Sequence, residues 1–567
     1  MPGPTLSRGP ALLNAVHAGH VEPATVTRHA RRVLQLVGRA GRLDAAEEAP
    51  EVSLDRPEHR RLAHDAAVSG MVLLTNDGTL PLGGTGEVRR LAVIGPNAAG
   101  DRIQGGGSSV VRPHRRVRLL QALAEAQPDV ELIHRVGAPN DRYVPLPEPS
   151  WLTTPSGDPG VVAEWIDGAD PAGDVVARSH ADRPGLVFTD APPESVARTG
   201  HVVRFRGVLA PPAGRYRMGL TATGPARVTL DGEPVLDIWD EREPGQAFFS
   251  QGSAEQTRVV ELDGGGHELR AEYLRPPRSL VGGLRVGIAP VDDEDALLDE
   301  AVGAAAAADV AVVVVGLTSD WEAEGFDRDG LELPGRQDEL VRRIAAANPR
   351  TVVVVNAGSP VAMPWLDDVA AVLQSWYAGQ EQGPAIAEVL FGHAEPGGRL
   401  PLSIPRRIDD SPAFAHYPGD GERVVYGEDL LVGYRGYQRS GVEPLFPFGH
   451  GCGYTTWQWG PAAVDGHGTD VSVVVELTNT GARAGSEVVQ VYRRWVDEPD
   501  PTRPVQELVG FTRIRADAGE SVQAQVDLDE RAFRRWEDGG WRVPSGDVVL
   551  EVGAFAGDLR SQANLRL

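Results

Sequence analysis

The chain has 567 residues, 41% of them hydrophobic and 24% charged, which is the composition of a globular protein with more than one hydrophobic core. Its 80 acidic and 55 basic residues give a formal net charge of −25, so nucleic acids and anionic membranes are not expected as partners. Every basic residue is arginine and Cys452 is the single cysteine, which excludes Schiff-base catalysis, a phosphate-loop lysine, an internal disulfide and a cysteine-bound metal cluster.

The first 57 residues predict a helix followed by a linker. The helix covers residues 11–43, where the apolar positions form one stripe and Gly41 stands where the helix should end. This stripe consists of Val26, Val33, Leu34, Leu36 and Val37. No strand precedes the helix, so residues 1–57 have the pattern of the last helix of a larger unit, followed by an acidic, proline-bearing linker at 44–57.

Helices and strands alternate in two separate stretches, residues 58–143 and 285–451. The first stretch contains a short buried strand, LAVIG, at 91–95. The second contains valine-rich strands at 309–316 and 350–356, each followed or preceded by a helical pattern. Near-continuous apolar strands separated by helices predict one α/β sandwich, in which a mostly parallel sheet is covered on both faces.

The residues between these stretches, 144–284, follow a different pattern. Apolar and polar residues alternate there, and Asp-Gly and Gly-Gly pairs mark the turns, which predicts an inserted antiparallel β-sandwich. Residues 452–567 repeat this pattern and predict a second β-sandwich of immunoglobulin-like size. The expected fold class is therefore multidomain, α/β plus all-β.

One loop, directly after the strand 309–316, gathers most of the side chains that could carry chemistry. Its sequence, GLTSDWEAEGFDRDGLELPG, places six carboxylates around Trp321, Phe326 and Arg328. The carboxylates are Asp320, Glu322, Glu324, Asp327, Asp329 and Glu332. Loops at the carboxyl ends of parallel strands are where ligands bind in such sheets. The loop is either a solvated acidic surface or a general acid/base beside an aromatic sugar platform, whose rings would favour the protonated form of a carboxyl.

A second loop, QGGGSS at 104–109, is rich in glycine and would let the backbone approach a partner closely. A flexible linker explains this loop nearly as well. It has neither a lysine nor the glycine spacing of a dinucleotide site, so nucleotide binding is excluded. The 14 histidines show no metal-ligand spacing, and no metal or organic cofactor is expected.

In this order, these segments resemble glycoside hydrolase family 3, which includes β-glucosidases. The resemblance rests on the succession of VLLTNDGTLPL, LAVIGPNA, QGGGSS, WEAEGFDRDGLELPGRQDELV, NAGSPVAMPW and PLFPFGHGCGYT. It implies that the inserted sandwich is a protective-antigen-like domain and that the last domain is fibronectin type III-like. It also implies that Glu324, the glutamate of an EGxDR motif, is the general acid/base, with Glu322 as the alternative.

The resemblance further implies a retaining hydrolase that removes terminal β-D-glucosyl residues from a small oligosaccharide or a β-glucoside, without a cofactor. Trp321 and Arg328 would shape the surroundings of the catalytic carboxyl. The inserted sandwich would cover the site and select the leaving group, and its aromatic residues Trp239, Phe248 and Phe249 are candidates for contacting substrate. Core packing is the competing role for each of these three rings.

Residues Met1–Pro4 match the MPGP motif that, in this family, follows a (β/α)8 barrel carrying the nucleophilic aspartate. The resemblance therefore implies that residues 1–57 are the end of that barrel plus a linker. It also implies that the nucleophile is not among these 567 residues, so that they are inactive alone. A misassigned start, a truncated gene and a barrel on a separate chain are all open, as is a non-catalytic carbohydrate-binding or interaction role. A cytoplasmic location is expected, and homo-oligomers are open.

Overall fold

A computed structural model describes residues 8–43, 51–84, 88–186, 192–197, 199–277, 281–498, 500–537 and 539–567. The chain divides into two compact units, Met1–Pro57 and Glu58–Leu567. The Met1–Pro4 motif and residues 44–50 of the expected linker lie outside the described residues.

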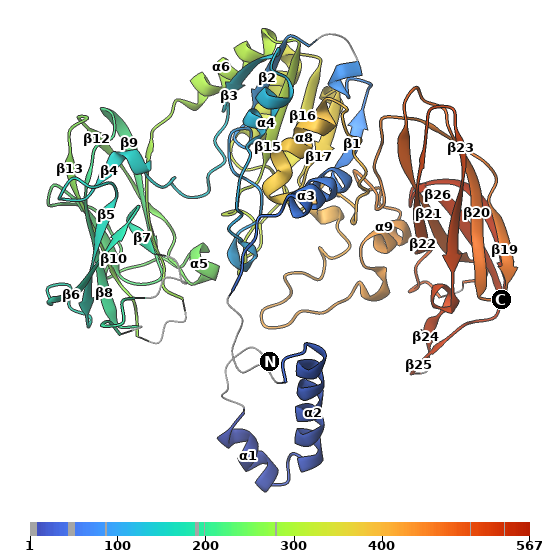
Figure 1. The fold of residues 1–567 in the computed structure, drawn as a ribbon, viewed down its shortest axis with the longest axis horizontal. Helices are drawn as coiled ribbons and strands as arrows, with labels where there is room; N and C mark the ends of the chain where they lie inside the picture. Colours follow the sequence, from blue (N-terminus) through green and yellow to red (C-terminus); the bar gives the residue numbers. More distant parts are fainter. Residues whose placement is uncertain are drawn as a thin grey trace. The chain divides into compact units, whose positions relative to one another are not determined.

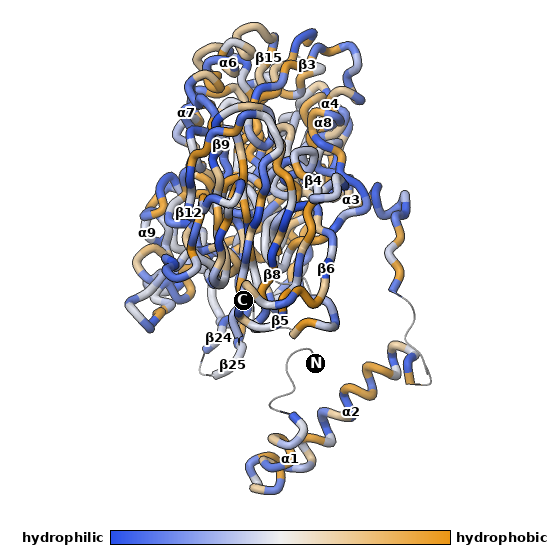
Figure 2. Tube along the Cα trace, turned by 90° about the vertical axis from the view of Figure 1, so that its left-hand side faces the viewer, coloured by the Kyte–Doolittle hydropathy of each residue, from blue (hydrophilic) through white to orange (hydrophobic). Residues whose placement is uncertain are grey.

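The described residues 8–43 of the first unit form two helices, α1 (Pro10–His17) and α2 (Pro23–Arg39), in place of the single helix expected over 11–43. The chain turns at Gly19, whose φ of 74° is left-handed, and Pro23 then begins α2 because proline suits the first helical turn. Gly41, with φ 65°, follows α2 as expected. Hydrophobic and hydrophilic residues are interleaved along α2 (Figure 2). Of its apolar side chains, Val33, Leu34 and Leu36 are exposed.

Six described strands form the mixed sheet of the second unit, in the order β1-β17-β16-β15-β2-β3. Their bounds are β1 Val72–Asn76, β2 Arg90–Ile94, β3 Glu131–Arg135, β15 Val310–Gly316, β16 Thr351–Asn356 and β17 Ala371–Gln374. Strands β17, β16, β15, β2 and β3 pair in parallel, and β1 joins the edge antiparallel to β17. β15 and β16 are buried along their whole length, as expected for valine-rich strands covered on both faces.

Helices cover both faces of this sheet (Figure 1). One face packs against α6 (Glu294–Ala306) and α7 (Gln337–Ala347). The other packs against α3 (Pro57–Gly70), α4 (Leu119–Ala126) and α8 (Gln382–Leu390). The predicted α/β sandwich is confirmed.

The segment inserted between β3 and α6 forms a β-sandwich, as predicted. One sheet has the order β11-β10-β13-β8-β5-β6, with β4 beside β8, and the other has the order β12-β9-β14-β7. The strands are β4 Leu152–Thr153, β5 Val161–Asp167, β6 Val175–Ala181, β7 Gly185–Leu186, β8 His201–Leu209, β9 Gly214–Ala222, β10 Ala226–Leu230, β11 Glu233–Asp237, β12 Gln256–Leu262, β13 His267–Leu274 and β14 Leu284–Pro290. Alternate residues such as Phe205, Met218 and Tyr273 fill the core between the sheets.

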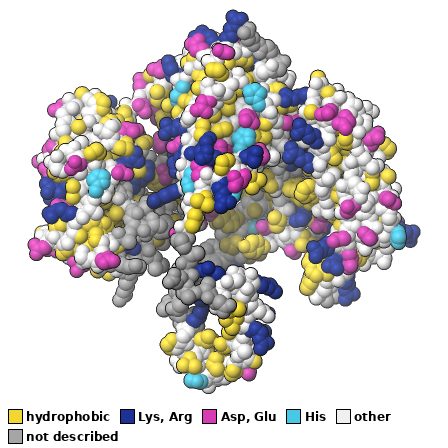
Figure 3. Space-filling model, viewed as in Figure 1, with side chains coloured by type: hydrophobic (Ala, Val, Ile, Leu, Met, Phe, Trp, Pro, Cys, Tyr) yellow, Lys and Arg dark blue, Asp and Glu magenta, His cyan; other side chains and the backbone are white. Residues whose placement is uncertain are grey.

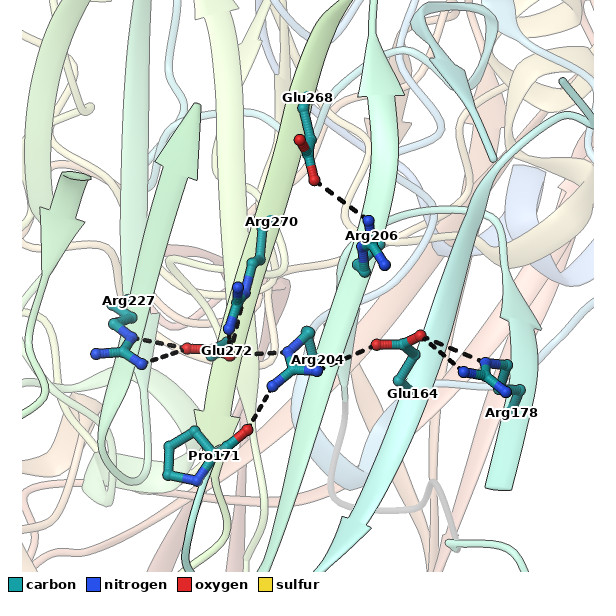
Figure 4. A network of polar contacts seen from close by, with 9 residues as sticks. All are labelled: Glu164, Pro171, Arg178, Arg204, Arg206, Arg227, Glu268, Arg270 and Glu272. Atoms are coloured by element: carbon teal, nitrogen blue, oxygen red, sulfur yellow. Dashed lines mark hydrogen bonds and ion pairs between the residues drawn. The ribbon is translucent and has the colours of Figure 1, made fainter. Parts of the chain in front are cut away.

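The outer face of the larger sheet carries a ladder of arginine and glutamate side chains across neighbouring strands (Figure 4). Glu272 is 2% exposed and accepts hydrogen bonds from Arg204, Arg227 and Arg270. Arg204 also reaches Glu164, at 3.3 Å. Burial raises the pKa of Glu272, but the three arginine hydrogen bonds together outweigh burial, so its pKa lies below the ordinary value.

The last part of the chain forms the second predicted β-sandwich. One sheet is β18-β20-β19 with β23 beside β20, and the other is β22-β21-β26-β27. The strands are β18 Trp457–Trp459, β19 Ala463–His467, β20 Asp470–Asn479, β21 Gly485–Trp495, β22 Glu507–Ala516, β23 Ser521–Leu528, β26 Asp547–Phe555 and β27 Asp558–Arg566. A separate hairpin joins β24 (Arg535–Glu537) to β25 (Gly540–Arg542). Across the described parts of the chain, we find no helix with both the length and the apolar character needed to cross a membrane.

Candidate active site

The acidic loop predicted to carry the chemistry, residues 316–335, leaves the carboxyl end of β15, near the centre of the sheet. Its first residues are fixed by buried asparagines from neighbouring strand ends. Asn97 donates to the Leu317 carbonyl and to Asn356 Oδ1, both at 3.1 Å, and Asn140 donates to Asn97 Oδ1 at 2.9 Å. Because all three asparagine side chains are buried, this network holds the start of the loop rigidly.

Glu324 is held by the glycine-rich loop 104–109. The Ser108 hydroxyl donates to Glu324 Oε1, and the Ser108 backbone N–H donates to Oε2 at 3.3 Å. Gly107 has φ 72°, and a Cβ atom there would lie 3.1 Å from Cγ of Glu324. Glycine at 107 therefore permits both the left-handed backbone and the close approach of the carboxylate.

Glu322, the alternative catalytic residue, is bonded to the loop that follows β16. The Ser359 hydroxyl donates to Oε1 and the Gly358 N–H donates to Oε2 at 2.9 Å, so both carboxylate oxygens are occupied by protein groups. Arg328 donates to the Ser359 hydroxyl at 3.2 Å and to the Pro360 carbonyl at 2.6 Å. Burial lowers the pKa of the Arg328 guanidinium, and the Glu322 carboxylate opposes that shift.

The aromatic rings of the loop pack around Arg142, which lies in the segment leading to the inserted sandwich. Its guanidinium carbon lies 4.1 Å from the Phe326 ring centroid and 5.0 Å from the Trp321 ring centroid. Arg142 also donates to the Asp320 carbonyl at 2.9 Å and to the Gln246 side chain of the sandwich. These contacts orient both rings and join the loop to the inserted domain.

Glu324 lines two cavities. The larger, of 750 Å³, lies between the loop and the inserted sandwich, and its other walls include Ser108, Asp320, Phe248 and Phe249. The second, of 520 Å³, is lined by Glu324 together with Glu322, Trp321, Phe326, Asp327, Arg328 and Tyr417. Glu324 is therefore the glutamate that borders both spaces, whereas Glu322 borders only the second.

The turn that brings the two phenylalanines to the larger cavity is strained. Phe248, Phe249 and Ser250, in the segment α5 (Ala247–Ser250), have φ values of 52°, 60° and 59°, which non-glycine residues rarely adopt. The Ser250 hydroxyl donates to the Gly325 carbonyl at 2.5 Å, and a Cβ at Gly325 would lie 2.7 Å from Cα of Phe249. The sandwich thus touches the loop at the residue next to Glu324.

Comparison with known proteins adds independent evidence to this geometry. Residues 71–454 match the model of the glycosyl hydrolase family 3 C-terminal domain, and residues 487–556 match a fibronectin type III-like domain. The chain belongs to glycosyl hydrolase family 3. It is therefore related to glycoside hydrolases, as the motif order indicated.

Proteins named as β-glucosidases are among the relatives of this family 3 chain. A "Beta-glucosidase" of Rhizobium radiobacter is 38% identical over 587 residues, and the alignment covers 100% of this chain and 70% of that protein. A "Probable beta-glucosidase J" of Neosartorya fischeri is 35% identical, with 97% and 68% covered. The crystal structure of a β-glucosidase from Kluyveromyces marxianus in complex with glucose superposes with a TM-score of 0.90 at 31% identity, covering 100% of this chain and 70% of that one.

The structure brings most of the predicted site residues of this family 3 chain together. Trp321 and Arg328 line the smaller cavity, and Phe248 and Phe249 line the larger one. Trp239 does not line either, because its ring lies beneath the Arg227 guanidinium, 4.9 Å away, at the end of the arginine–glutamate ladder.

Sequence reasoning missed the residues that hold Glu324. Ser108 belongs to the QGGGSS loop, whose composition predicts a linker almost as readily as a binding loop, and its contact with Glu324 spans 216 positions. The position of the loop after a buried strand, opposite the acidic loop, is the signal that could have found it. Among the described residues, no group of three or more His, Cys, Asp or Glu side chains could hold a metal ion.

Proposed function

We propose that this chain carries the general acid/base of a retaining β-glucosidase that hydrolyses terminal, non-reducing β-D-glucosyl residues. The supporting observation is the setting of Glu324, whose carboxylate borders both cavities and is held by the hydroxyl and the N–H of Ser108. A hydroxyl donates to a carboxylate and accepts from a carboxylic acid, so this contact suits both protonation states.

Glu324 would act twice in each turnover. It first gives its proton to the leaving glycosidic oxygen while a second carboxylate attacks the anomeric carbon. It then removes a proton from the water that hydrolyses the glycosyl-enzyme, which restores the acid. Glu322 would position this machinery, because it borders only the smaller cavity, whereas Glu324 borders both.

The attacking carboxylate must lie about 5 Å from the acid/base in a retaining enzyme. The family resemblance assigns it to an aspartate of a (β/α)8 barrel. We therefore propose that a polypeptide of residues 1–567 alone does not turn over substrate.

The larger cavity would receive the leaving group. It has phenylalanine rings from the inserted sandwich on one side and Glu324 on the other, and apolar walls with a few polar groups are typical of small-molecule sites. The substrate class would be a small oligosaccharide or a β-glucoside.

A fusion tests this function. Residues 1–567 would be joined to the portion of the Rhizobium radiobacter β-glucosidase that they do not match, with the intact Rhizobium enzyme as control. We expect the fusion to hydrolyse 4-nitrophenyl β-D-glucoside and to release β-glucose first, as seen by proton NMR, while residues 1–567 alone do not. Turnover by residues 1–567 alone, or a folded fusion that binds glucose without turnover, would contradict the proposal; the latter would favour a non-catalytic carbohydrate-binding role.

A further inference from the structure

The β24–β25 hairpin presents two tryptophans at one end of the C-terminal sandwich, where hydrophobic and arginine side chains lie side by side (Figure 3). Trp536 and Trp541 are cross-strand partners, with ring centroids 5.5 Å apart and planes at 75°. Their exposed fractions are 57% and 63%. Large aromatic rings that remain exposed together mark a surface that binds something.

These rings border a cavity of 370 Å³ that shares no lining residue with the two cavities at Glu324. A third tryptophan, Trp495 at the end of β21, also lines it. The Arg535 guanidinium lies 4.4 Å from the Trp495 ring centroid and fixes the ring. The Trp495 indole N–H is buried and has no hydrogen-bond partner in the described structure. A buried donor without an acceptor is costly, so a polar group that reached this N–H would be favourable there.

The positive charges around this cavity are already paired. Each arginine in its wall is paired with a carboxylate, so an anionic ligand would have to displace an existing ion pair. The pairs are Arg493 with Glu507, Arg503 with Glu537, Arg534 with Glu530 and Arg535 with Glu498. This pairing favours a neutral ligand over a phosphate or another anion.

A neutral sugar fits these features. The C–H face of a pyranose ring stacks on an aromatic ring, and its hydroxyl groups exchange hydrogen bonds with an indole N–H and with guanidinium and carboxylate groups. The volume lies within the range of small-molecule sites. We infer that the cavity bordered by Trp495, Trp536 and Trp541 is a second carbohydrate-binding site, which takes the end of a neutral oligosaccharide outside the catalytic cavities. The class of ligand, a neutral carbohydrate, is inferred from the cavity alone. The choice of a β-linked glucose oligomer as the specific ligand rests on the proposed function.

The test uses the whole 567-residue chain, titrated with cellotetraose, with maltotetraose as the α-linked comparison. Calorimetry measures affinity, and the indole N–H signal of Trp495 in NMR reports this cavity alone, after assignment with Trp495→Phe. We expect saturable binding of cellotetraose that shifts this signal. Replacing Trp536 and Trp541 together by alanine should weaken binding about ten-fold or more. Trp495→Phe, which keeps a ring and removes the N–H, should weaken it roughly three-fold.

Two control variants locate the effect. Phe511→Ala removes a ring that is 67% exposed on β22 of the same domain and should leave binding unchanged. Glu324→Gln should also leave the cellotetraose-induced shift of the Trp495 signal unchanged. The experiment can therefore disprove binding at this cavity without bearing on the proposed catalysis, and the reverse. Trp536→Phe combined with Trp541→Phe should retain binding, which guards against misfolding of the alanine variant.

Four results would overturn the inference. The first is absence of saturable binding by the wild-type chain, and the second is unchanged binding by the double alanine variant. The third is concentration-dependent self-association that the double variant abolishes while sugars have no effect, which would make the hairpin a protein-docking surface. Shifts of the Trp495 signal by inorganic phosphate but not by sugar would likewise contradict a neutral ligand.

Discussion

The acidic loop after β15 and the outer face of the inserted sandwich both concentrate glutamates, yet they hold them differently. On the sandwich, Glu272 is bonded to three arginines, which keep it ionised. In the loop, Glu324 and Glu322 are bonded to serine hydroxyls and backbone N–H groups, which carry no charge. A count of carboxylates does not distinguish the two regions, but the charge of their hydrogen-bond partners does.

This difference separates structural from chemical use of the same residue type. Arginine partners stabilise the anion and oppose protonation, so a carboxylate in the ladder suits stability and not proton transfer. Neutral donors fix the direction of a carboxylate and favour its anion less strongly than arginine partners do. Substitutions in the two regions should therefore have different consequences, from a large loss of activity to a small change in the pH dependence of stability.

Replacing Glu324 by glutamine in the active fusion should lower kcat/KM for 4-nitrophenyl β-D-glucoside by about 10²–10⁴-fold, because proton transfer to the leaving oxygen is lost. The loss should be smaller with a 2,4-dinitrophenyl leaving group, which departs without a proton. Glu272→Gln is the matched control from the ladder and should leave kcat/KM within about two-fold, since it alters no group at the cavities. Equal losses for both leaving groups would argue against Glu324 as the acid.

Glu272→Ala should instead destabilise the inserted sandwich by about 2–4 kcal/mol, because it leaves partly buried arginines without their shared carboxylate. Hydrogen exchange of the β13 amides measures this locally. Glu268→Ala removes the exposed carboxylate that Arg206 reaches at 3.4 Å, and should change the local free energy by less than about 0.5 kcal/mol. Equal effects of the two variants would contradict the role given to the ladder.

Gly107→Ala should reduce kcat of the fusion about ten-fold and cost about 1–2 kcal/mol of stability, because alanine is strained at φ 72° and its Cβ would press on the Glu324 side chain. Gly441→Ala is the control, since Gly441 has φ 71° and a Cβ added there would meet nothing within 4 Å. The control should show the stability loss alone. If Gly441→Ala lowered kcat as much as Gly107→Ala does, the loss of activity in Gly107→Ala could not be attributed to its contact with Glu324.

The pH dependence of stability should carry the smallest signal. The folded pKa of Glu272 lies below its ordinary value of 4.5, so its stabilising contribution is complete above about pH 4.5 and is lost as the pH falls through the lower, folded pKa. The Glu272→Gln variant should therefore lose less stability than the wild-type chain between about pH 5 and 3. Hydrogen exchange of β13 at several pH values measures the difference, and parallel profiles would contradict it.

The architecture could be predicted from the sequence because burial leaves a strong pattern. Valine runs such as 310–315 predicted strands buried on both faces, and alternation predicted the two β-sandwiches. The helix expected over 11–43 is interrupted, since Gly19 permits a left-handed turn that periodicity does not detect.

The candidate site was predictable only in part. The loop after β15 was located by its position and its acidic residues, but the contact of Ser108 with Glu324 depends on how distant strand ends meet. Trp239 was a candidate for contacting substrate, with packing as the competing role, and its ring packs under Arg227, because residue type does not specify where a ring points. The left-handed turn at Phe248–Ser250 could likewise not be predicted, because none of its three residues is a glycine.

Chemical rescue tests the central claim most directly, namely that Glu324 and not Glu322 transfers the proton. In the Glu324→Gln fusion, assayed with 2,4-dinitrophenyl β-D-glucoside so that the first step needs no proton, the glycosyl-enzyme should wait for a base to activate water. Sodium azide, which needs no base, should restore turnover and yield β-glucosyl azide of retained configuration. The account predicts this rescue for Glu324→Gln and none for Glu322→Gln. Rescue of Glu322→Gln, with none for Glu324→Gln, would contradict it.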